Sequence, residues 1–455
     1  MQDFGKLEDF IFEKMSKTHL PGLSIAIVKD GETIYSRGFS FRDLEYGLRA
    51  TPETLYGIGS VTKSFTALSI MQLVEEGKLS LEDPVSKHAP LDLKSGEEPV
   101  RIWHLLSHAS GLPALAYAEA YIRYVTGADG KWMPVASSED LFNFMKDANK
   151  WALTKPGERW FYLNEGYVTL GYIIEKLSGM RYVEYVKKRI LEPLKMTRSF
   201  FKKEDVDADR DVAVPYIITR DGECKKSVVP YGIGADGGLL SNVLDLARYV
   251  NMYINRGNYD GGSLLSEEHI EEMEKPRIKL PIQIFNGEAY GYGLMTIPNF
   301  LGNKLVGHGG SVLVYTAYIG YIPDKKIGIA LLANGSGYML SQMSLYGLAL
   351  MLGENPETLP FIKMERTFEL LSGLYETYKG TMKAQVVEKG GILELQIKDK
   401  YTDMMIPLIP ENIDNKTKTF YTVQAGGKLP IEFMTDEDKV ELIYERYRLK
   451  KVGKL

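Results

Sequence analysis

A serine and a lysine three residues apart form the sharpest chemical signal in this sequence. Ser60 and Lys63 lie in the run Gly-Ser-Val-Thr-Lys (59–63), at the start of an apolar stretch with helical spacing. Residues three apart share a helical face, so the amine is within reach of the hydroxyl. Serine needs an adjacent base, and burial at a helix N-terminus lowers the pKa of a lysine towards that of a base. The pair predicts a nucleophilic serine; the alternative is that Ser60 caps the helix while Lys63 reaches solvent.

Two further segments contain residues that fit the same chemistry. Tyr162 and Asn164 stand two apart just before a helical pattern. The run Gly-His-Gly-Gly-Ser (307–311) precedes a long strand pattern, and its glycines would let the backbone approach a substrate closely. Taken singly, Tyr162 could be a core aromatic, Asn164 a helix cap and the glycine pair a β-bulge. Together with the serine and lysine, they indicate one catalytic site.

In this order the three segments resemble the motif set of penicillin-binding proteins and serine β-lactamases. The sequence is most similar to the branch of class C β-lactamases, D-alanyl-D-alanine carboxypeptidases, D-aminopeptidases and esterases. Residues 103–112 resemble that branch's HLLTHTSGL segment, and 155–157, 290–294 and 320–335 are also similar. The resemblance covers roughly residues 8 to 350, or about three-quarters of the chain.

The resemblance implies a metal-free and cofactor-free serine hydrolase mechanism. Ser60 would be the nucleophile, Lys63 its base or proton shuttle, and Tyr162 the group that protonates the leaving atom. An acyl-enzyme would form on the serine and then be hydrolysed by water.

The resemblance also implies which residues bind the substrate. Asn164, His308 and Gly310 would contact it, and the backbone N–H groups of Ser60 and Ser311 would form the oxyanion hole. One position departs from the β-lactamase pattern, because this chain has His308 where those enzymes have the lysine of Lys-Thr-Gly. Histidine titrates near pH ~6.5 and can be neutral, so it is poorly suited to clamping a substrate carboxylate. We expect His308 to hydrogen-bond Tyr162 or the substrate instead.

Several other signals have simpler readings. The Gly-x-Gly-x-x-Gly match at 232–237 lacks the parallel strand and acidic residue of a dinucleotide site, and the related family carries a glycine-rich turn there. His104 and His108 are four apart without the Glu of a zinc motif, so buried structural histidines are expected. Cys224 has no nearby histidine to activate it.

The elements that must position these residues belong to two expected domains. Strand patterns near residues 23–35 and 314–332 flank a series of helical patterns, which predicts an antiparallel sheet whose terminal segments meet, flanked by helices. This α/β (α+β) domain of β-lactamase type should span 1–353, followed by a linker at 354–365. Short strand patterns separated by turns predict a small antiparallel, lipocalin-like β-barrel at 366–455.

Composition limits the classes of partner. The 455 residues include 55 basic and 60 acidic side chains, a net charge of −5, without the basic stripe of a nucleic-acid-binding protein. A single cysteine excludes an intrachain disulfide. No apolar run of membrane-spanning length and no secretory signal is visible, so a cytoplasmic location without membrane contact is expected. Scarce Gln with abundant Lys, Glu and Ile leans towards a thermophilic source.

The expected substrate is a peptide or a small amide or ester. We favour a peptidase of aminopeptidase or carboxypeptidase type, because an added C-terminal barrel resembles the D-aminopeptidase architecture. A carboxylesterase or weak β-lactamase is the alternative within the enzymes, and a non-catalytic ligand-binding or scaffold protein is the alternative outside them. The barrel could restrict access to the site or form a homo-oligomer. The aromatic-rich segment 114–138 is either a packed surface insertion or a rim of the substrate site.

Overall fold

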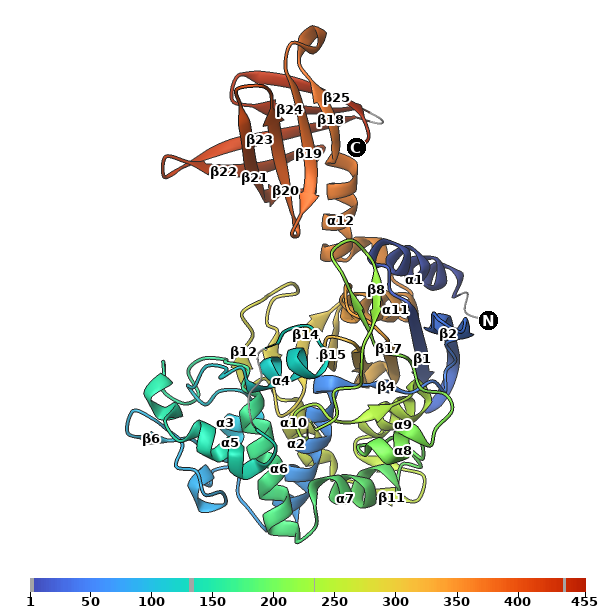
Figure 1. The fold of residues 1–455 in the computed structure, drawn as a ribbon, viewed down its shortest axis with the longest axis vertical. Coiled ribbons are helices and arrows are strands. Elements are labelled where there is room, and N and C mark those ends of the chain that lie inside the picture. Colours follow the sequence, from blue (N-terminus) through green and yellow to red (C-terminus); the bar gives the residue numbers. More distant parts are fainter. Residues whose placement is uncertain (1–3, 131–134, 233, 437–438) are drawn as a thin grey trace. The chain divides into compact units, whose positions relative to one another are not determined.

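The computed structural model describes residues 4–130, 135–232, 234–436 and 439–455. The chain divides into two compact units, Met1–Glu354 and Asn355–Leu455 (Figure 1). The first consists of a large antiparallel sheet with helices, and the second is a closed β-barrel, so the expected fold class is confirmed. In the described residues, no helix is both long enough and apolar enough to cross a membrane.

The sheet of the first unit joins the two ends of that unit. Its nine strands are all antiparallel, and β1 pairs with β17 from Leu23–Ala333 to Lys29–Ile327, as expected for terminal segments that meet. The strands, in spatial order, are β12 (Ile278–Lys279), β13 (Ala289–Tyr290), β14 (Met295–Phe300), β15 (Asn303–Ser311), β16 (Thr316–Ile322), β17 (Ile327–Ala333), β1 (Gly22–Lys29), β2 (Glu32–Asp43) and β3 (Leu48–Arg49).

Helices cover both faces of the central strands. Every residue of β17 is buried, because α9 (Val243–Ile254) and α11 (Leu340–Met351) both contact this strand. Neighbouring residues show the two faces: Gly328 lies against Val250 of α9, and Ile329 lies against Gly347 of α11. A strand covered on both faces reads as an uninterrupted apolar run, which explains the sequence Ile-Gly-Ile-Ala-Leu-Leu-Ala.

Helix α2 (Thr62–Glu75), which contains the predicted catalytic lysine, runs through the interior of the first unit. Its residues Thr62 to Leu73 are all buried, and it contacts α6 (Asn164–Ser178) and α10 (Glu267–Glu274). The helix can be buried on all sides because the hydroxyls of Ser64, Thr66 and Ser69 donate to backbone carbonyls of the preceding turn. Figure 1 shows α2 in blue among these helices. The end of α2 that contains Lys63 is therefore held in place by close packing on all sides.

Shorter elements complete the first unit. The remaining helices are α1 (Gly5–Thr18), α3 (Ile102–Leu106), α4 (Tyr117–Val125), α5 (Ser138–Met145), α7 (Tyr182–Val186) and α8 (Lys203–Asp207). The remaining strands form two-residue or three-residue ladders: β4 (Tyr56–Gly57) with β9 (Leu240–Ser241), β5 (Lys94–Ser95) with β6 (Glu98–Pro99), β7 (Tyr216–Ile218) with β8 (Cys224–Lys226), and β10 (Asn258–Tyr259) with β11 (Gly262–Ser263). Single-turn helices include η1 (Gly59–Val61), η2 (Val85–Lys87), η3 (Ala148–Trp151), η4 (Lys187–Leu191) and η5 (Pro323–Lys325).

The second unit is a closed barrel with its own apolar interior. Alternate residues such as Leu393, Leu395 and Phe433 are buried, as the period of two in a strand requires. The barrel strands are β18 (Gly373–Glu376), β19 (Lys383–Lys389), β20 (Ile392–Lys398), β21 (Asp403–Asn412), β22 (Thr417–Gln424), β23 (Gly427–Asp436), β24 (Lys439–Tyr444) and β25 (Tyr447–Gly453). A single turn, η7 (Tyr378–Gly380), lies between β18 and β19.

The predicted linker at 354–365 differs from the structure. Much of it is helical, in η6 (Pro356–Thr358) and the first half of α12 (Pro360–Leu371). Both helices begin with proline, whose missing N–H and fixed φ suit the first helical position. The last turn of α12 contributes Phe368 and Leu371 to the apolar interior of the barrel unit. The two prolines therefore mark helix starts rather than an extended connection.

Candidate active site

Ser60 lies in the single turn η1, directly before α2, at a point where two backbone segments touch. Gly59 has a φ of +52°, which favours glycine, and a Cβ on it would lie 2.8 Å from the backbone nitrogen of Ser311. A Cβ on Gly310 would lie 2.0 Å from Ile58 O and 3.1 Å from the nitrogen of Ser60. The close contact places the N–H groups proposed for the oxyanion hole on adjoining segments. Ser60 itself is partly exposed.

Lys63 is the polar centre of the site. Its side chain is fully buried, and its Nζ lies 3.2 Å from Ser60 Oγ, 2.8 Å from Asn164 Oδ1 and 2.5 Å from the carbonyl oxygen of Asp236. Loss of water around the ammonium lowers the pKa of Lys63 to about 8, although nearby carboxylates oppose this shift. The amine is therefore close to neutral at mildly alkaline pH and lies within reach of the serine hydroxyl.

Tyr162 lies beside the serine and the lysine, as the motif predicts. Lys63 Nζ is 4.8 Å from the centre of its ring, within the range of a cation–π contact. Burial raises the pKa of the Tyr162 phenol above its usual value, and a hydrogen bond with Ser60 opposes this shift. Tyr162 is therefore a neutral phenol at physiological pH, with a proton to donate.

Asn164, the first residue of α6, connects Lys63 to the segment that sequence left unassigned. Its Oδ1 accepts from Lys63, and its Nδ2 donates to Glu119 Oε1 at 3.3 Å. Glu119 lies in the first turn of α4, inside the segment 114–138. That segment therefore contributes a side chain to the surroundings of the site, as a substrate rim would.

His308 pairs with Tyr290 and Gly309 rather than with Tyr162, one of the two partners expected for it. Its Nε2 pairs with the hydroxyl of Tyr290 at 2.7 Å, and its Nδ1 pairs with the carbonyl of Gly309 at 2.6 Å. A carbonyl can only accept, so Nδ1 carries the proton and Nε2 accepts from the phenol. Burial, with a smaller effect of Lys63, lowers the pKa of His308 to about 3. Tyr290, rather than Tyr162, therefore pairs with this imidazole. The two lie close in the sheet, because Met295 of β14 pairs with Tyr290 on one side and with Gly307 on the other.

The two histidines four residues apart are buried and hydrogen-bonded, which confirms the structural reading. His104 Nδ1 accepts from the N–H of Arg101, and His108 Nδ1 accepts from the N–H of Leu163. The ring of His108 lies 4.1 Å from that of Tyr162. Burial lowers the pKa of both imidazoles, so the His108 ring that packs against Tyr162 is neutral.

Three groups near Lys63 were not assigned a role from sequence. Tyr117 donates its N–H to Glu165 Oε1 and its hydroxyl to Asp236 Oδ2, which anchors the start of α4. Burial raises the pKa of Glu165 to about 7 and raises that of Asp236. Asp236 lies in the glycine-rich segment 232–237, and Glu165 directly follows Asn164. Their positions beside the motifs are the only signal in the sequence.

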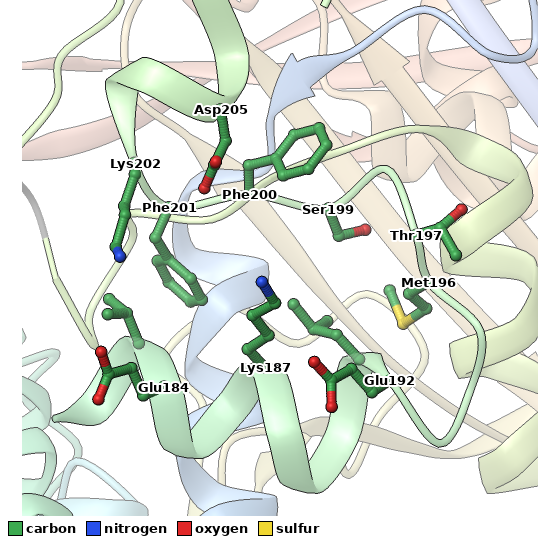
Figure 2. Close-up of a pocket in the computed structure, with 12 residues that line it drawn as sticks. Glu184, Lys187, Glu192, Met196, Thr197, Ser199, Phe200, Phe201, Lys202 and Asp205 are labelled. Atoms are coloured by element: carbon green, nitrogen blue, oxygen red, sulfur yellow. The ribbon is translucent and has the colours of Figure 1, made fainter. Parts of the chain in front are cut away.

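A separate pocket of about 280 Å³ contains none of the predicted site residues (Figure 2). Figure 2 shows Glu184, Lys187 and Glu192 on one helical segment, facing the segment that carries Phe201 and Lys202. Its charged groups have mixed sign and include no paired nucleophile and base.

Comparison with family models matches most of the chain. The beta-lactamase family model matches residues 7–349, and the model of the Pab87 octamerisation domain matches residues 356–450. The protein flp of Staphylococcus aureus is 27% identical over 332 residues, which is 72% of this chain and 62% of that protein. Penicillin-binding protein 4* of Bacillus subtilis is 25% identical over 461 residues, which is 96% of this chain and 95% of that protein. The chain thus aligns with less than two-thirds of flp.

Solved structures extend the similarity to both units. The octameric penicillin-binding protein homologue from Pyrococcus abyssi is 54% identical, with a TM-score of 0.95 over 99% of this chain and 100% of that chain. A D-stereospecific amidohydrolase from Streptomyces is 23% identical, with a TM-score of 0.63 over 77% of this chain and 99% of that chain, and shares the fold. The chain therefore belongs to the beta-lactamase family, a family of serine hydrolases with the fold of penicillin-binding proteins.

Proposed function

We propose that this protein is a serine peptidase that works through an acyl-enzyme on Ser60. The proposal rests chiefly on one contact, the 3.2 Å approach of Lys63 Nζ to Ser60 Oγ, made by an amine with a pKa lowered to about 8. A non-catalytic scaffold has no need for a buried lysine directed at a partly exposed serine. Desolvating that amine costs stability, so a functional role is the better account.

The proposed reaction has two steps. Neutral Lys63 takes the proton of Ser60 as Oγ attacks the substrate carbonyl, and the N–H groups of Ser60 and Ser311 stabilise the resulting oxyanion. Tyr162 donates its proton to the leaving nitrogen as the carbon–nitrogen bond breaks, and the Lys63 ammonium returns a proton to the phenolate. Water then attacks the acyl-enzyme with Lys63 again as base, and Ser60 regains its proton.

Amide substrates are favoured over β-lactams. His308 is neutral and is bonded to Tyr290 and Gly309, so it offers no fixed cation to the carboxylate of a β-lactam. The D-stereospecific amidohydrolase from Streptomyces and the D-amino acid amidase from Ochrobactrum anthropi share the fold, which supports amide cleavage with D-residues among the substrates. A carboxylesterase remains the second candidate, because a serine acyl-enzyme also cleaves esters.

We further propose that the chain assembles as a homo-oligomer through its barrel unit. The match to an octamerisation domain at 356–450 and the octameric homologue from Pyrococcus abyssi support this assembly. Exposed apolar side chains on the barrel, among them Met405 and Val423, are suited to burial between copies.

A fluorophosphonate probe tests the assignment directly. Wild type should be labelled and Ser60→Ala should not, whereas Ser178→Ala, at the end of α6, should be labelled as wild type. The same variants are then compared on peptide p-nitroanilides of L and D residues, p-nitrophenyl esters and nitrocefin. Labelling of Ser60→Ala at the wild-type rate would reject the acyl-enzyme, and nitrocefin as the best substrate would reject the peptidase.

A further inference from the structure

We propose that the carboxylate of Glu119 binds the free α-ammonium group of the substrate, so that the site removes residues from the N-terminus of peptides. This inference deepens the proposed function and rests on it. It selects the aminopeptidase from the two exopeptidase types and gives the segment 114–138 a role in specificity.

The position of Glu119 is set by its contact with Asn164. Asn164 Oδ1 is occupied by Lys63, and Asn164 Nδ2 donates to Glu119 Oε1, so the carboxylate lies one side chain away from the catalytic amine. The family resemblance implies that Asn164 also contacts the substrate. The α-nitrogen of the acyl residue is two bonds from the carbonyl carbon that Ser60 attacks, and in the proposal a substrate held by Asn164 presents this nitrogen to the neighbouring Glu119 carboxylate.

Glu119 is a carboxylate available to a cationic ligand. Its side chain is exposed, and within the described ranges no lysine, arginine or histidine forms an ion pair with it. Tyr117 fixes the first turn of α4 through Glu165 and Asp236, so Glu119 is carried by an anchored helix rather than a loose loop. A fixed carboxylate loses less entropy on binding an ammonium than a mobile one.

Two further carboxyl groups lie buried beside Lys63, each with one unpaired oxygen. Glu165 Oε2 and Asp236 Oδ1 are both shielded from solvent and have no hydrogen-bond partner in the described structure. Glu165 is 1% exposed and Asp236 is 2% exposed. Both lie close enough to Lys63 to affect its titration. Burial lowers the pKa of Lys63 and both carboxyl groups act in the opposite direction, so their field favours a cationic substrate group over an anionic one.

Among the residues that the structure describes, the motif positions supply no fixed cation for a substrate carboxylate. His308 occupies the position of the family's lysine, and both of its ring nitrogens are already used by Tyr290 and Gly309. Lys63 is committed to Ser60, Asn164 and Asp236. A C-terminal carboxylate would therefore face acidic groups without a fixed positive partner, whereas an N-terminal ammonium would meet Glu119.

The test compares substrates that differ only in the charge of the α-nitrogen. Phenylalanine p-nitroanilide and its N-acetyl derivative are assayed as L and D forms with wild type, Glu119→Gln and Glu119→Asp. Glu271→Gln, an exposed carboxyl on α10, is the matched control. Wild type should prefer the free amine by at least about tenfold in kcat/KM, since a tenfold change corresponds to a single modest ion-pair contact.

The variants separate binding from a structural effect. Glu119→Gln should lose about tenfold in kcat/KM on the free amine, mainly through KM, while turnover of the acetylated substrate stays within about twofold. Glu119→Asp should recover part of the loss. An equal loss on both substrates, or a wild-type preference for the acetylated one, overturns the inference. If Ser60 reacts with fluorophosphonate but neither substrate is cleaved, the inference fails and the hydrolase stands; if Ser60 does not react, both fail.

Discussion

The hydroxyl of Tyr290 donates a 2.7 Å hydrogen bond to Nε2 of His308. Because the other ring nitrogen faces the carbonyl of Gly309, this bond fixes one neutral tautomer of the imidazole. Burial lowers the pKa of His308 to about 3, so the ring stays neutral across the physiological range. The pair replaces the cation of the β-lactamase motif with a neutral link between β13 and β15.

Replacement of His308 by glutamine should lower activity without changing its pH dependence. Gln can pair with Tyr290 only in a different geometry, so we expect kcat/KM to fall by about tenfold, as for loss of one positioning contact. The profile from pH 5 to 9 should keep the wild-type shape, because neither side chain titrates there. Loss of a limb centred near pH 6.5 would show that His308 is charged in the working enzyme, and full activity at every pH would remove its role.

Tyr162→Phe should distinguish substrates by their leaving group. The variant lacks the phenolic proton that an amide nitrogen requires, so p-nitroanilide turnover should fall by about 10²–10⁴-fold, the usual range for general acid catalysis. A p-nitrophenyl ester has a leaving group that departs as an anion and should lose far less. Parallel assays of both substrates check this, and an equal loss on the two would show that Tyr162 acts before the leaving group departs.

Gly310→Ala should disrupt the oxyanion hole. A Cβ at this position would lie 2.0 Å from Ile58 O, so the strand and the Ser60 turn must move apart. A shift of about 1 Å at a catalytic centre costs about 10²-fold in rate, and kcat/KM should fall by that amount. Gly309→Ala is the matched control, since its Cβ would meet nothing nearer than 4.0 Å. Comparable activity of the two variants would argue against this contact as the basis of the oxyanion hole.

Phe433→Ala should destabilise the barrel unit. The ring is fully buried, and its centre lies 5.5 Å from that of the Phe420 ring and 6.2 Å from that of the Tyr375 ring. Its removal therefore leaves a cavity. Denaturant unfolding of the full chain should show a loss of about 3–5 kcal/mol in the transition of this unit. Lys389→Ala, at an exposed side chain at the end of β19, should change the free energy of unfolding by less than about 0.5 kcal/mol. Equal effects would mean that Phe433 does not belong to the interior.

Local patterns in the sequence predicted much of this fold. The strand patterns near residues 23–35 and 314–332 match β1, β16 and β17, because these strands are buried almost throughout and are therefore rich in apolar residues. The end strands of the barrel were not predicted. β18 has only four residues, and β25 (Tyr-Arg-Leu-Lys-Lys-Val-Gly) has a single buried residue, Leu449, so neither carries enough apolar residues to mark a strand by itself.

The site was predictable only where its residues share a motif. Helical spacing predicted that the Lys63 amine reaches the Ser60 hydroxyl. The family resemblance predicted that Tyr162 and Asn164 belong to the same site. The bond between Tyr290 and His308, and the position of Glu119, depend on how distant segments pack. No periodicity in a single sequence encodes such contacts, because they form between elements rather than within one.

The pH dependence of acylation at Ser60 tests the central claim most directly. Fluorophosphonate adducts are located by peptide mass mapping, and their rate of formation is measured from pH 6 to 9 in wild type and Lys63→Arg. Below its pKa of about 8 the Lys63 amine is protonated and cannot accept the serine proton, so the wild-type rate should rise with pH and level off above 8. Arginine stays protonated over this whole pH range, so Ser60 in the Lys63→Arg variant should be acylated at least about 10³-fold more slowly than in wild type at every pH. A rate independent of pH, or a Lys63→Arg variant that reacts like wild type, would contradict the account.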